Sequence, residues 1–180
     1  MVRSLTPKSN RILRVVTSSP EETQSFGRLL GSLLAHGDFV ALIGELGAGK
    51  TCLAQGIISG LGVTSRVVSP SFNLIREYEG RLPVFHIDVY RLDDSRDMLD
   101  LDYEEYFYGS GVSIVEWADR IRDLLPAEHL EIRMWWDADH DPNTRWIEVK
   151  PNGRRYKEIV KALKERWKSE SSYTPSKGVR

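Results

Sequence analysis

Apolar residues along this chain fall into short continuous runs and into helical repeats. Residues 39–43 are continuously apolar and lie between Gly37 and Gly44, as in a strand buried on both faces of a parallel sheet. Residues 112–115, apolar except for Ser113, are a second candidate for a buried strand. The apolar residues at 26, 29, 30, 33 and 34 instead recur with the period of a helix. This repeat, with Ser19 as N-cap, predicts a helix from Pro20 to about residues 36–37.

The rest of the pattern alternates strands with helices. It predicts strands at residues 12–17, 72–78, 82–88, 131–136 and 145–149, and an extended segment at 66–68. Helices are predicted at residues 50–61 and 118–125 and over an amphipathic stretch ending at Trp167, and residues 93–107 are expected to be helical in part. Glu79 and Gly80 separate two of the strands, which indicates an antiparallel hairpin and therefore a mixed sheet.

Length and composition favour a single domain. The chain has 180 residues, 41% of them hydrophobic, which is enough to bury one core. We expect a basic N-terminal tail over residues 1–11, one domain over 12–167, and a mobile C-terminal tail over 168–180. No apolar stretch reaches membrane-spanning length, and the single cysteine, Cys52, excludes an internal disulfide. These features predict a soluble, cytoplasmic protein with no membrane contact.

Charge is nearly balanced overall but unevenly distributed. The net charge of −1 argues against a generally basic nucleic-acid binder. Residues 150–168 carry eight Lys and Arg against two Glu, whereas residues 77–105 carry ten Asp and Glu against three Arg. Two interpretations stay open: this polarity could orient docking on a charged partner, or both stretches could be solvated faces.

Residues 44–51, GELGAGKT, match the phosphate-binding pattern GxxxxGK[ST] between a predicted strand and a predicted helix. The glycines let the backbone wrap around phosphates, and the helix N-terminus adds a positive dipole end. We expect Lys50 to contact the β- and γ-phosphates and the Thr51 hydroxyl to bind Mg²⁺. The expected nucleotide contacts here are Gly44, Glu45, Gly47, Ala48, Gly49, Lys50, Thr51 and Cys52. The motif predicts an α/β fold of the P-loop NTPase type, with a mixed, mainly parallel sheet flanked by helices.

Two strand ends supply the carboxylates that a metal-assisted phosphate site needs. Asp88 ends one strand in a Walker-B-like position, but Val89 follows it where many ATPases have a glutamate, so the usual base is missing. Glu116 follows the run at 112–115 and, in a parallel sheet, would emerge at the edge that carries the P-loop. Its alternative interpretation is a surface glutamate that starts a helix. His86 is expected to point to the opposite side of its strand from Asp88 and is given no catalytic role.

Together these residues define an expected site, with Lys50, Asp88 and Glu116 in catalysis and Thr51, Asp88 and Glu116 as metal ligands. The chain has no NKxD motif, no DxxG after Asp88 and no LSGGQ-like signature, so small-GTPase and ABC-type interpretations lose support and ATP is favoured. Two alternatives to an ATPase stay open. One is a small-molecule kinase, although the acidic segment 93–108 contains only Arg96 to close on phosphates. The other is a nucleotide-dependent interaction module that does not hydrolyse.

Four motifs in order resemble one family. GELGAGKT is followed by SPSF at residues 69–72, HIDVYRL at 86–92 and VEW at 115–117, and together they resemble the TsaE (YjeE) family of small bacterial P-loop ATPases. The resemblance covers about residues 17–149. The family usually has threonine where this chain has Ser71, a change that keeps the hydroxyl and removes a methyl group.

The resemblance implies an accessory ATPase of threonylcarbamoyladenosine synthesis at the tRNA adenosine next to the anticodon. Its partners would be TsaD-like and TsaB-like proteins, with tRNA reached indirectly through their complex. The family's magnesium ligands map onto Thr51 and Glu116, and its Walker-B-type aspartate maps onto Asp88. Trp117 would shape the site beside Glu116. The segment at Thr17 and Ser18 would supply adenine contacts.

Overall fold

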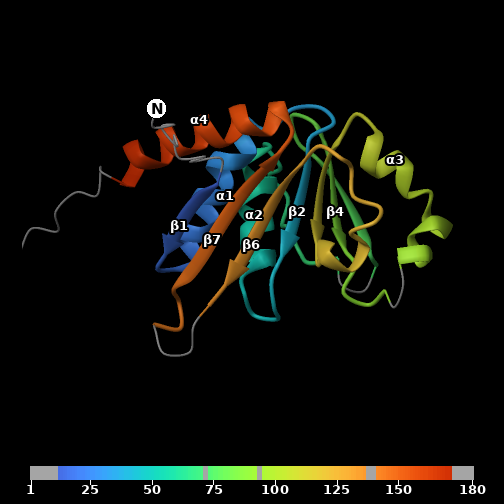
Figure 1. Ribbon diagram of the computed structural model, residues 1–180, viewed down its shortest axis with the longest axis horizontal. Coiled ribbons are helices and arrows are strands. Elements are labelled where there is room, and N and C mark those ends of the chain that lie inside the picture. Colours follow the sequence, from blue (N-terminus) through green and yellow to red (C-terminus); the bar gives the residue numbers. More distant parts are fainter. Residues whose placement is uncertain (1–11, 71–72, 93–94, 137–140, 172–180) are drawn as a thin grey trace, which may run out of the picture.

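A seven-stranded mixed sheet forms the centre of the protein in a computed structural model that describes residues 12–70, 73–92, 95–136 and 141–171 (Figure 1). The strands are β1 (Leu13–Thr17), β2 (Phe39–Ile43), β3 (Ile75–Glu79), β4 (Pro83–Asp88), β5 (Val112–Glu116), β6 (His129–Trp135) and β7 (Arg145–Asn152). The helices are α1 (Pro20–Leu33), α2 (Lys50–Gly60), α3 (Tyr103–Tyr108) and α4 (Arg154–Ser171), with 3₁₀ helices η1 (Ser95–Leu101) and η2 (Ala118–Ile121). The predicted N-terminal tail, Ser71 and residues 172–180 of the predicted C-terminal tail lie outside the described residues.

The strand order is β1-β7-β6-β2-β5-β4-β3 among the described residues. The four central strands, β6, β2, β5 and β4, pair in parallel. The outer pairings, β1 with β7, β7 with β6 and β4 with β3, are antiparallel. The predicted α/β fold with a mixed sheet and the predicted hairpin at Glu79 and Gly80 are confirmed. Parallel pairing is confined to the centre, where the P-loop strand β2 has β5 on one side and β6 on the other.

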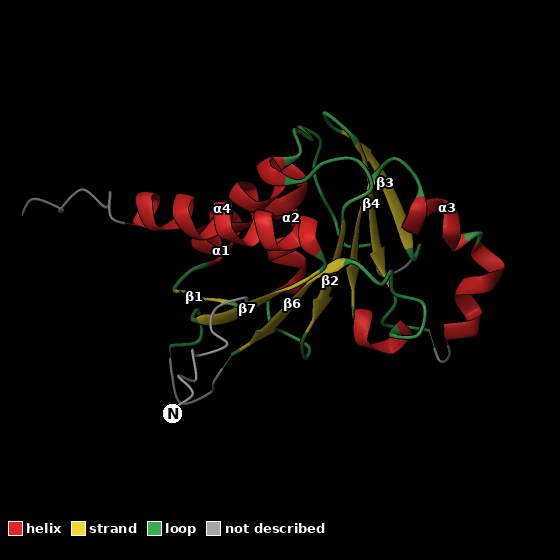
Figure 2. Ribbon diagram, turned by 45° about the horizontal axis from the view of Figure 1, so that its top comes forward, coloured by secondary structure: helices red, strands yellow, loops and turns green. Residues whose placement is uncertain are grey.

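Helices cover both faces of the sheet, because its central strands are apolar on both sides (Figure 2). On one face, α1, α2 and α4 pack over inward residues such as Val40 and Leu42. On the other, η1, α3 and η2 pack over residues such as Phe39 and Ala41. Alternate residues of β2 therefore enter different cores, as the period-two geometry of a strand requires. None of the described helices is long and apolar enough to cross a membrane.

Helices α1 and α2 pack backbone against backbone through glycines. A Cβ added at Gly27 would lie 2.7 Å from the carbonyl oxygen of Leu53, and one added at Gly31 would overlap the carbonyl of Ile57. Gly56 and Gly60, on α2, face the backbone of α1 in the same way. Because the P-loop leads directly into α2, this close contact fixes the helix that presents the phosphate site.

Helix α1 ends at Leu33, earlier than the predicted end near residues 36–37. Arginines distant in the sequence take over its terminal carbonyls. Arg81 donates to the carbonyls of Gly31 and Leu34 at 2.8 and 2.6 Å, and Arg155 donates to that of Leu33 at 3.0 Å. The two arginines therefore donate to carbonyl oxygens that would otherwise accept from the backbone N–H groups of a further helical turn. The early end is therefore a tertiary effect.

Other boundaries also differ from the prediction, including those of β3, β6 and β7, which were expected at residues 72–78, 131–136 and 145–149. Residues 66–68 are in no strand, and their backbone is held by side chains instead. The helix predicted at 118–125 is a single 3₁₀ turn, Ala118–Ile121. Helix α4 continues to Ser171, four residues beyond the predicted end at Trp167.

Candidate functional site

The loop between β2 and α2 has the backbone form that its glycines allow. Gly49, immediately before α2, has φ +96°, and Gly44 has φ +154°, both in the region that favours glycine. A Cβ at Gly44 would overlap the carbonyl oxygen of Met134 on β6. The first and last turns of the loop therefore depend on glycine, one for close approach to a neighbouring strand and one for the start of the helix.

Lys50 is the first residue of α2, and its side chain folds back over the loop. Its Nζ donates to the carbonyl oxygens of Gly44 at 2.6 Å and Glu45 at 2.8 Å. The same ammonium lies 3.5 Å from the centre of the Trp117 ring, a cation–π contact. Lys50 is only 4% exposed, and burial lowers the pKa of its ammonium, while nearby carboxylates led by Glu116 oppose that shift. A bound anionic group would stabilise the charged form of this ammonium, as water would have done without burial.

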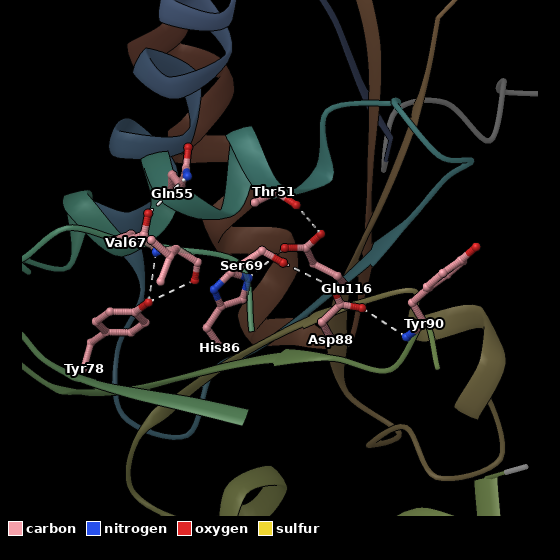
Figure 3. Close-up of polar contacts among 10 residues, drawn as sticks. Thr51, Gln55, Val67, Ser69, Tyr78, His86, Asp88, Tyr90 and Glu116 are labelled. Carbon is pink, nitrogen blue, oxygen red and sulfur yellow. Dashed lines mark hydrogen bonds and ion pairs between the residues drawn. The ribbon is translucent and has the colours of Figure 1, made fainter. Parts of the chain in front are cut away.

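Glu116 occupies the centre of the site, at the carboxyl end of β5. Its Oε2 accepts a hydrogen bond from the Thr51 hydroxyl at 2.8 Å, and its Oε1 lies 2.8 Å from Nε2 of His86. Figure 3 shows these three side chains directed toward one another from α2, β4 and β5. The parallel register that pairs Leu42 with Glu116 places the carboxylate at the P-loop edge, as predicted. Glu116 is 1% exposed, so the alternative of a surface helix-start glutamate is wrong.

Asp88 ends β4 directly beside Glu116 in the sheet register. Its Oδ1 accepts from the backbone N–H of Tyr90 at 3.0 Å, and Ser69 Oγ donates to its Oδ2 at 3.4 Å (Figure 3). The Tyr90 ring stacks in a tilted arrangement on Trp117, with centroids 4.7 Å apart. Asp88 is therefore tied both to the aromatic rim of the site and to the segment that contains Ser69.

A cavity of about 450 Å³ joins these groups. Its lining residues are Leu46, Gly47, Gly49, Lys50, Thr51, Asp88, Tyr90, Arg91, Glu116 and Trp117. The described residues contain no cluster of three or more His, Cys, Asp and Glu that could enclose a metal ion by themselves. A hydroxyl and one or two carboxylates are nevertheless the usual protein share of a Mg²⁺ site, in which phosphate oxygens and water complete the coordination. The site can therefore hold a phosphate chain with its cation.

Seven of the predicted site residues line this cavity, and six do not. Gly44 and Glu45 are outside its lining, and their carbonyl oxygens accept from Lys50. The Ala48 side chain is buried in the core. The Thr17 hydroxyl is buried against that of Thr23 at 2.7 Å, and Ser18 is exposed. Cys52 donates to the carbonyl of Pro20 at 3.4 Å, and burial raises the pKa of its thiol.

A second, smaller cavity of about 80 Å³ lies between the start of α1 and the P-loop. Its lining includes Thr23, Gly49, Cys52 and Arg145, but neither Thr17 nor Ser18. Arg145 also donates to the carbonyl of Gly47 at 3.3 Å. Nucleotide contact by Thr17, Ser18 and Cys52 stays a prediction.

The prediction that His86 points away from Asp88 is wrong. Residues two apart on a strand share a face, and Figure 3 shows His86 and Asp88 both projecting from β4 toward α2. Sequence reasoning also missed Tyr90 and Arg91 in the cavity, although both lie within the HIDVYRL motif. The i, i+2 spacing of His86 and Asp88 was the signal that could have found the histidine.

Comparison with known proteins places the chain in a family. The family model described as "Threonylcarbamoyl adenosine biosynthesis protein TsaE" matches residues 17–145. A Bacillus subtilis protein named tRNA threonylcarbamoyladenosine biosynthesis protein TsaE is 42% identical over 148 residues, 82% of this chain and 90% of its own length. The Treponema pallidum protein of the same name is 42% identical over 127 residues, 71% of this chain and 94% of its own. The crystal structure of Bacillus subtilis YdiB superposes with a TM-score of 0.73 at 37% identity, covering 86% of this chain and 95% of that one. With the P-loop, HIDVYRL and VEW motifs assembled around one cavity, these matches show that the chain belongs to the TsaE family.

Proposed function

We propose that this protein is an ATPase that serves threonylcarbamoyladenosine modification of tRNA as an accessory factor. The modification pathway is the one named in the family description and in its curated relatives. The observation that carries the ATPase assignment is the convergence of Lys50, Thr51 and Glu116 on one cavity at the start of α2.

The chain's own groups divide the work at this site. The loop N–H groups and the N-terminus of α2 would bind the phosphates. The Lys50 ammonium would move from the carbonyl oxygens of Gly44 and Glu45 to the terminal phosphates and neutralise their charge. Thr51 and Glu116, with Asp88 close by, would hold Mg²⁺. Bound there, Mg²⁺ would supply the charge that stabilises the leaving phosphate oxygens. The stacked rings of Trp117 and Tyr90 would shield one side from water.

The site has no carboxylate after Asp88 to polarise the attacking water, because Val89 is there and is buried. Glu116 is the nearest carboxylate in the register, but both its oxygens already accept hydrogen bonds. We therefore expect the isolated chain to turn over ATP slowly and to accelerate when partners complete the site. TsaD-like and TsaB-like proteins are the partners we propose, with tRNA reached through them.

Phosphate release from Mg-ATP, measured for the purified chain alone and with TsaD and TsaB from the same source, tests this proposal. We expect slow release alone and a clear increase with both partners, together with partner-dependent formation of threonylcarbamoyladenosine on tRNA. Transfer of phosphate to a small acceptor by the isolated chain would favour a kinase. Tight ATP binding with no hydrolysis even beside both partners would favour a binding module.

A further inference from the structure

The carboxylate of Glu116 is held at both of its oxygens. Thr51 donates to Oε2 and His86 contacts Oε1, each at 2.8 Å, and Glu116 and His86 are 1% and 0% exposed. As a carboxylate, Glu116 can only accept, so the proton in the contact with His86 sits on Nε2 of the ring. The orientation of the carboxylate is therefore set from two sides, by the helix of the P-loop and by β4.

The environment of His86 fits poorly with a purely structural role. Its second ring nitrogen, Nδ1, is buried and has no hydrogen-bond partner among the described residues. A buried polar atom left without a partner destabilises the folded state. An apolar residue of similar size would pack at this position without that cost. What the imidazole does supply, and an apolar side chain would not, is a donor aimed at one oxygen of Glu116.

We propose that His86 is the positioning residue of Glu116: its Nε2–H fixes the carboxylate so that Oε2 is presented beside the Thr51 hydroxyl, where the metal ion is to bind. The inference rests on the proposed function, since it assigns His86 to the metal side of that site. Partners of metal ligands commonly act in this way, by holding a ligand in its binding orientation. Without His86, the hydrogen bond from Thr51 is the one side-chain hydrogen bond left to Glu116 among the described residues, so its side chain can turn about its χ angles.

Two variants with the same functional group separate positioning from packing. In His86→Gln the amide nitrogen reaches about as far as Nε2 and can donate to Glu116. In His86→Asn the same amide is one methylene shorter and falls near the position of Nδ1. The two differ in donor position but not in polarity, so the asparagine serves as the matched control.

The first measurement uses the nucleotide-free protein and needs no activity. Correlation spectra of the imidazole ¹⁵N nuclei report which ring nitrogen carries the proton, and the chain has only four histidines. The His86 signals are those that disappear in His86→Gln. A proton on Nε2, with its shift altered in Glu116→Gln, supports the contact. A proton on Nδ1 alone overturns the proposal.

The second measurement is the Mg²⁺ concentration required for tight ATP binding, followed by calorimetry, with ATP binding in EDTA as the control for an intact P-loop. We expect His86→Asn to weaken Mg²⁺ affinity by about 10–100-fold, the range typical of lost ligand partners. His86→Gln should recover most of that loss, and binding in EDTA should stay unchanged in both.

The outcomes separate the two proposals. Equal Mg²⁺ affinity in the asparagine and glutamine variants would refute positioning by His86 and leave the proposed function standing. Wild-type protein that binds no Mg-ATP would instead refute the proposed function. Should His86→Asn fail to fold, as its thermal unfolding would reveal, the ring tautomer of the wild-type protein still decides whether His86 donates to Glu116.

Discussion

Replacing Glu116 by glutamine removes the negative charge at the centre of the site while keeping its shape. The new amide oxygen can accept from Nε2 of His86, and its NH₂ can donate to Thr51, because the threonine hydroxyl can change from donor to acceptor. Both contacts therefore survive, and we expect the free energy of unfolding to change by less than about 1 kcal/mol. Glu116→Ala is a poorer probe, because it opens a cavity and leaves the buried Nε2–H of His86 without its acceptor.

The catalytic effect should be far larger than the structural one. Loss of one group that stabilises charge developing in the transition state typically lowers turnover by about 10²–10³, or roughly 2.7–4 kcal/mol. We expect Glu116→Gln to lose that factor in steady-state phosphate release with partners present. ATP affinity in EDTA should stay close to wild type, because the P-loop is untouched.

A matched control is available on β6. Glu131 is also a buried glutamate, held by Arg133 at 3.0 Å and Lys150 at 3.9 Å, and it does not line the site cavity. Glu131→Gln should lower stability and leave turnover unchanged. Wild-type turnover in Glu116→Gln, or an equal loss in both variants, would refute the role assigned to Glu116.

Three further substitutions test other parts of the structure. Lys50→Ala should abolish ATP binding by calorimetry with little change in melting temperature, and hydrolysis at the wild-type rate would disprove the P-loop assignment. Gly31→Ala should lower the free energy of unfolding in urea by about 1–3 kcal/mol, because the added methyl group overlaps the backbone of α2 at Ile57. Ser32→Ala, at an exposed position of the same helix, is the control and should cause no such loss. Asp88→Asn should raise the Mg²⁺ concentration needed for ATP hydrolysis, and an unchanged Mg²⁺ requirement would place Asp88 outside the metal's surroundings.

The parts of the site that follow from local sequence were predictable. The P-loop motif determines both a backbone shape and its position between a strand and a helix, so Lys50 and Thr51 could be assigned before the fold was known. Placing Glu116 needed one more step of reasoning, namely that the carboxyl ends of parallel strands lie at the same edge of a sheet. The parallel pairing of β2 with β5 confirms this placement. Nothing in composition or periodicity indicates tRNA modification, which enters through the motif resemblance and the relatives.

The parts that depend on distant contacts were not predictable. The end of α1 is set by Arg81 and Arg155, which lie 50 and 122 residues from the carbonyls that they reach at Gly31 and Leu33. The segment at 66–68 looks extended in sequence, but it belongs to no strand and is held instead by the side chains of Gln55 and Tyr78. Such features arise from side chains meeting across the fold, and no local pattern encodes them.

Helix α4 keeps most of its basic residues away from its packing face. Tyr156, Ile159 and Val160 are buried against the rest of the fold. Arg154, by contrast, has a 92% exposed side chain that lies 3.6 Å from the exposed carboxylate of Glu158, and Lys157 and Lys161 are exposed. Arg155 differs from these, since it anchors the helix to the buried Asp38 at 2.9 Å. Charge can therefore be reversed at three positions without disturbing the core.

If this basic face steers the protein onto an acidic partner surface, reversing it should act on the association rate. We expect the triple change of Arg154, Lys157 and Lys161 to glutamate to slow association with the partner complex at least about tenfold at low salt, and to flatten its dependence on ionic strength. Stability should shift little, because exposed substitutions each change the free energy of unfolding by about 0.5 kcal/mol or less. Stopped-flow association at two salt concentrations measures the effect.

The matched control applies the same change in net charge to three exposed arginines on other elements, namely Arg28, Arg66 and Arg122. Equal slowing in both triple variants would assign the effect to net charge, and no slowing in either would make the basic face of α4 a solvated surface.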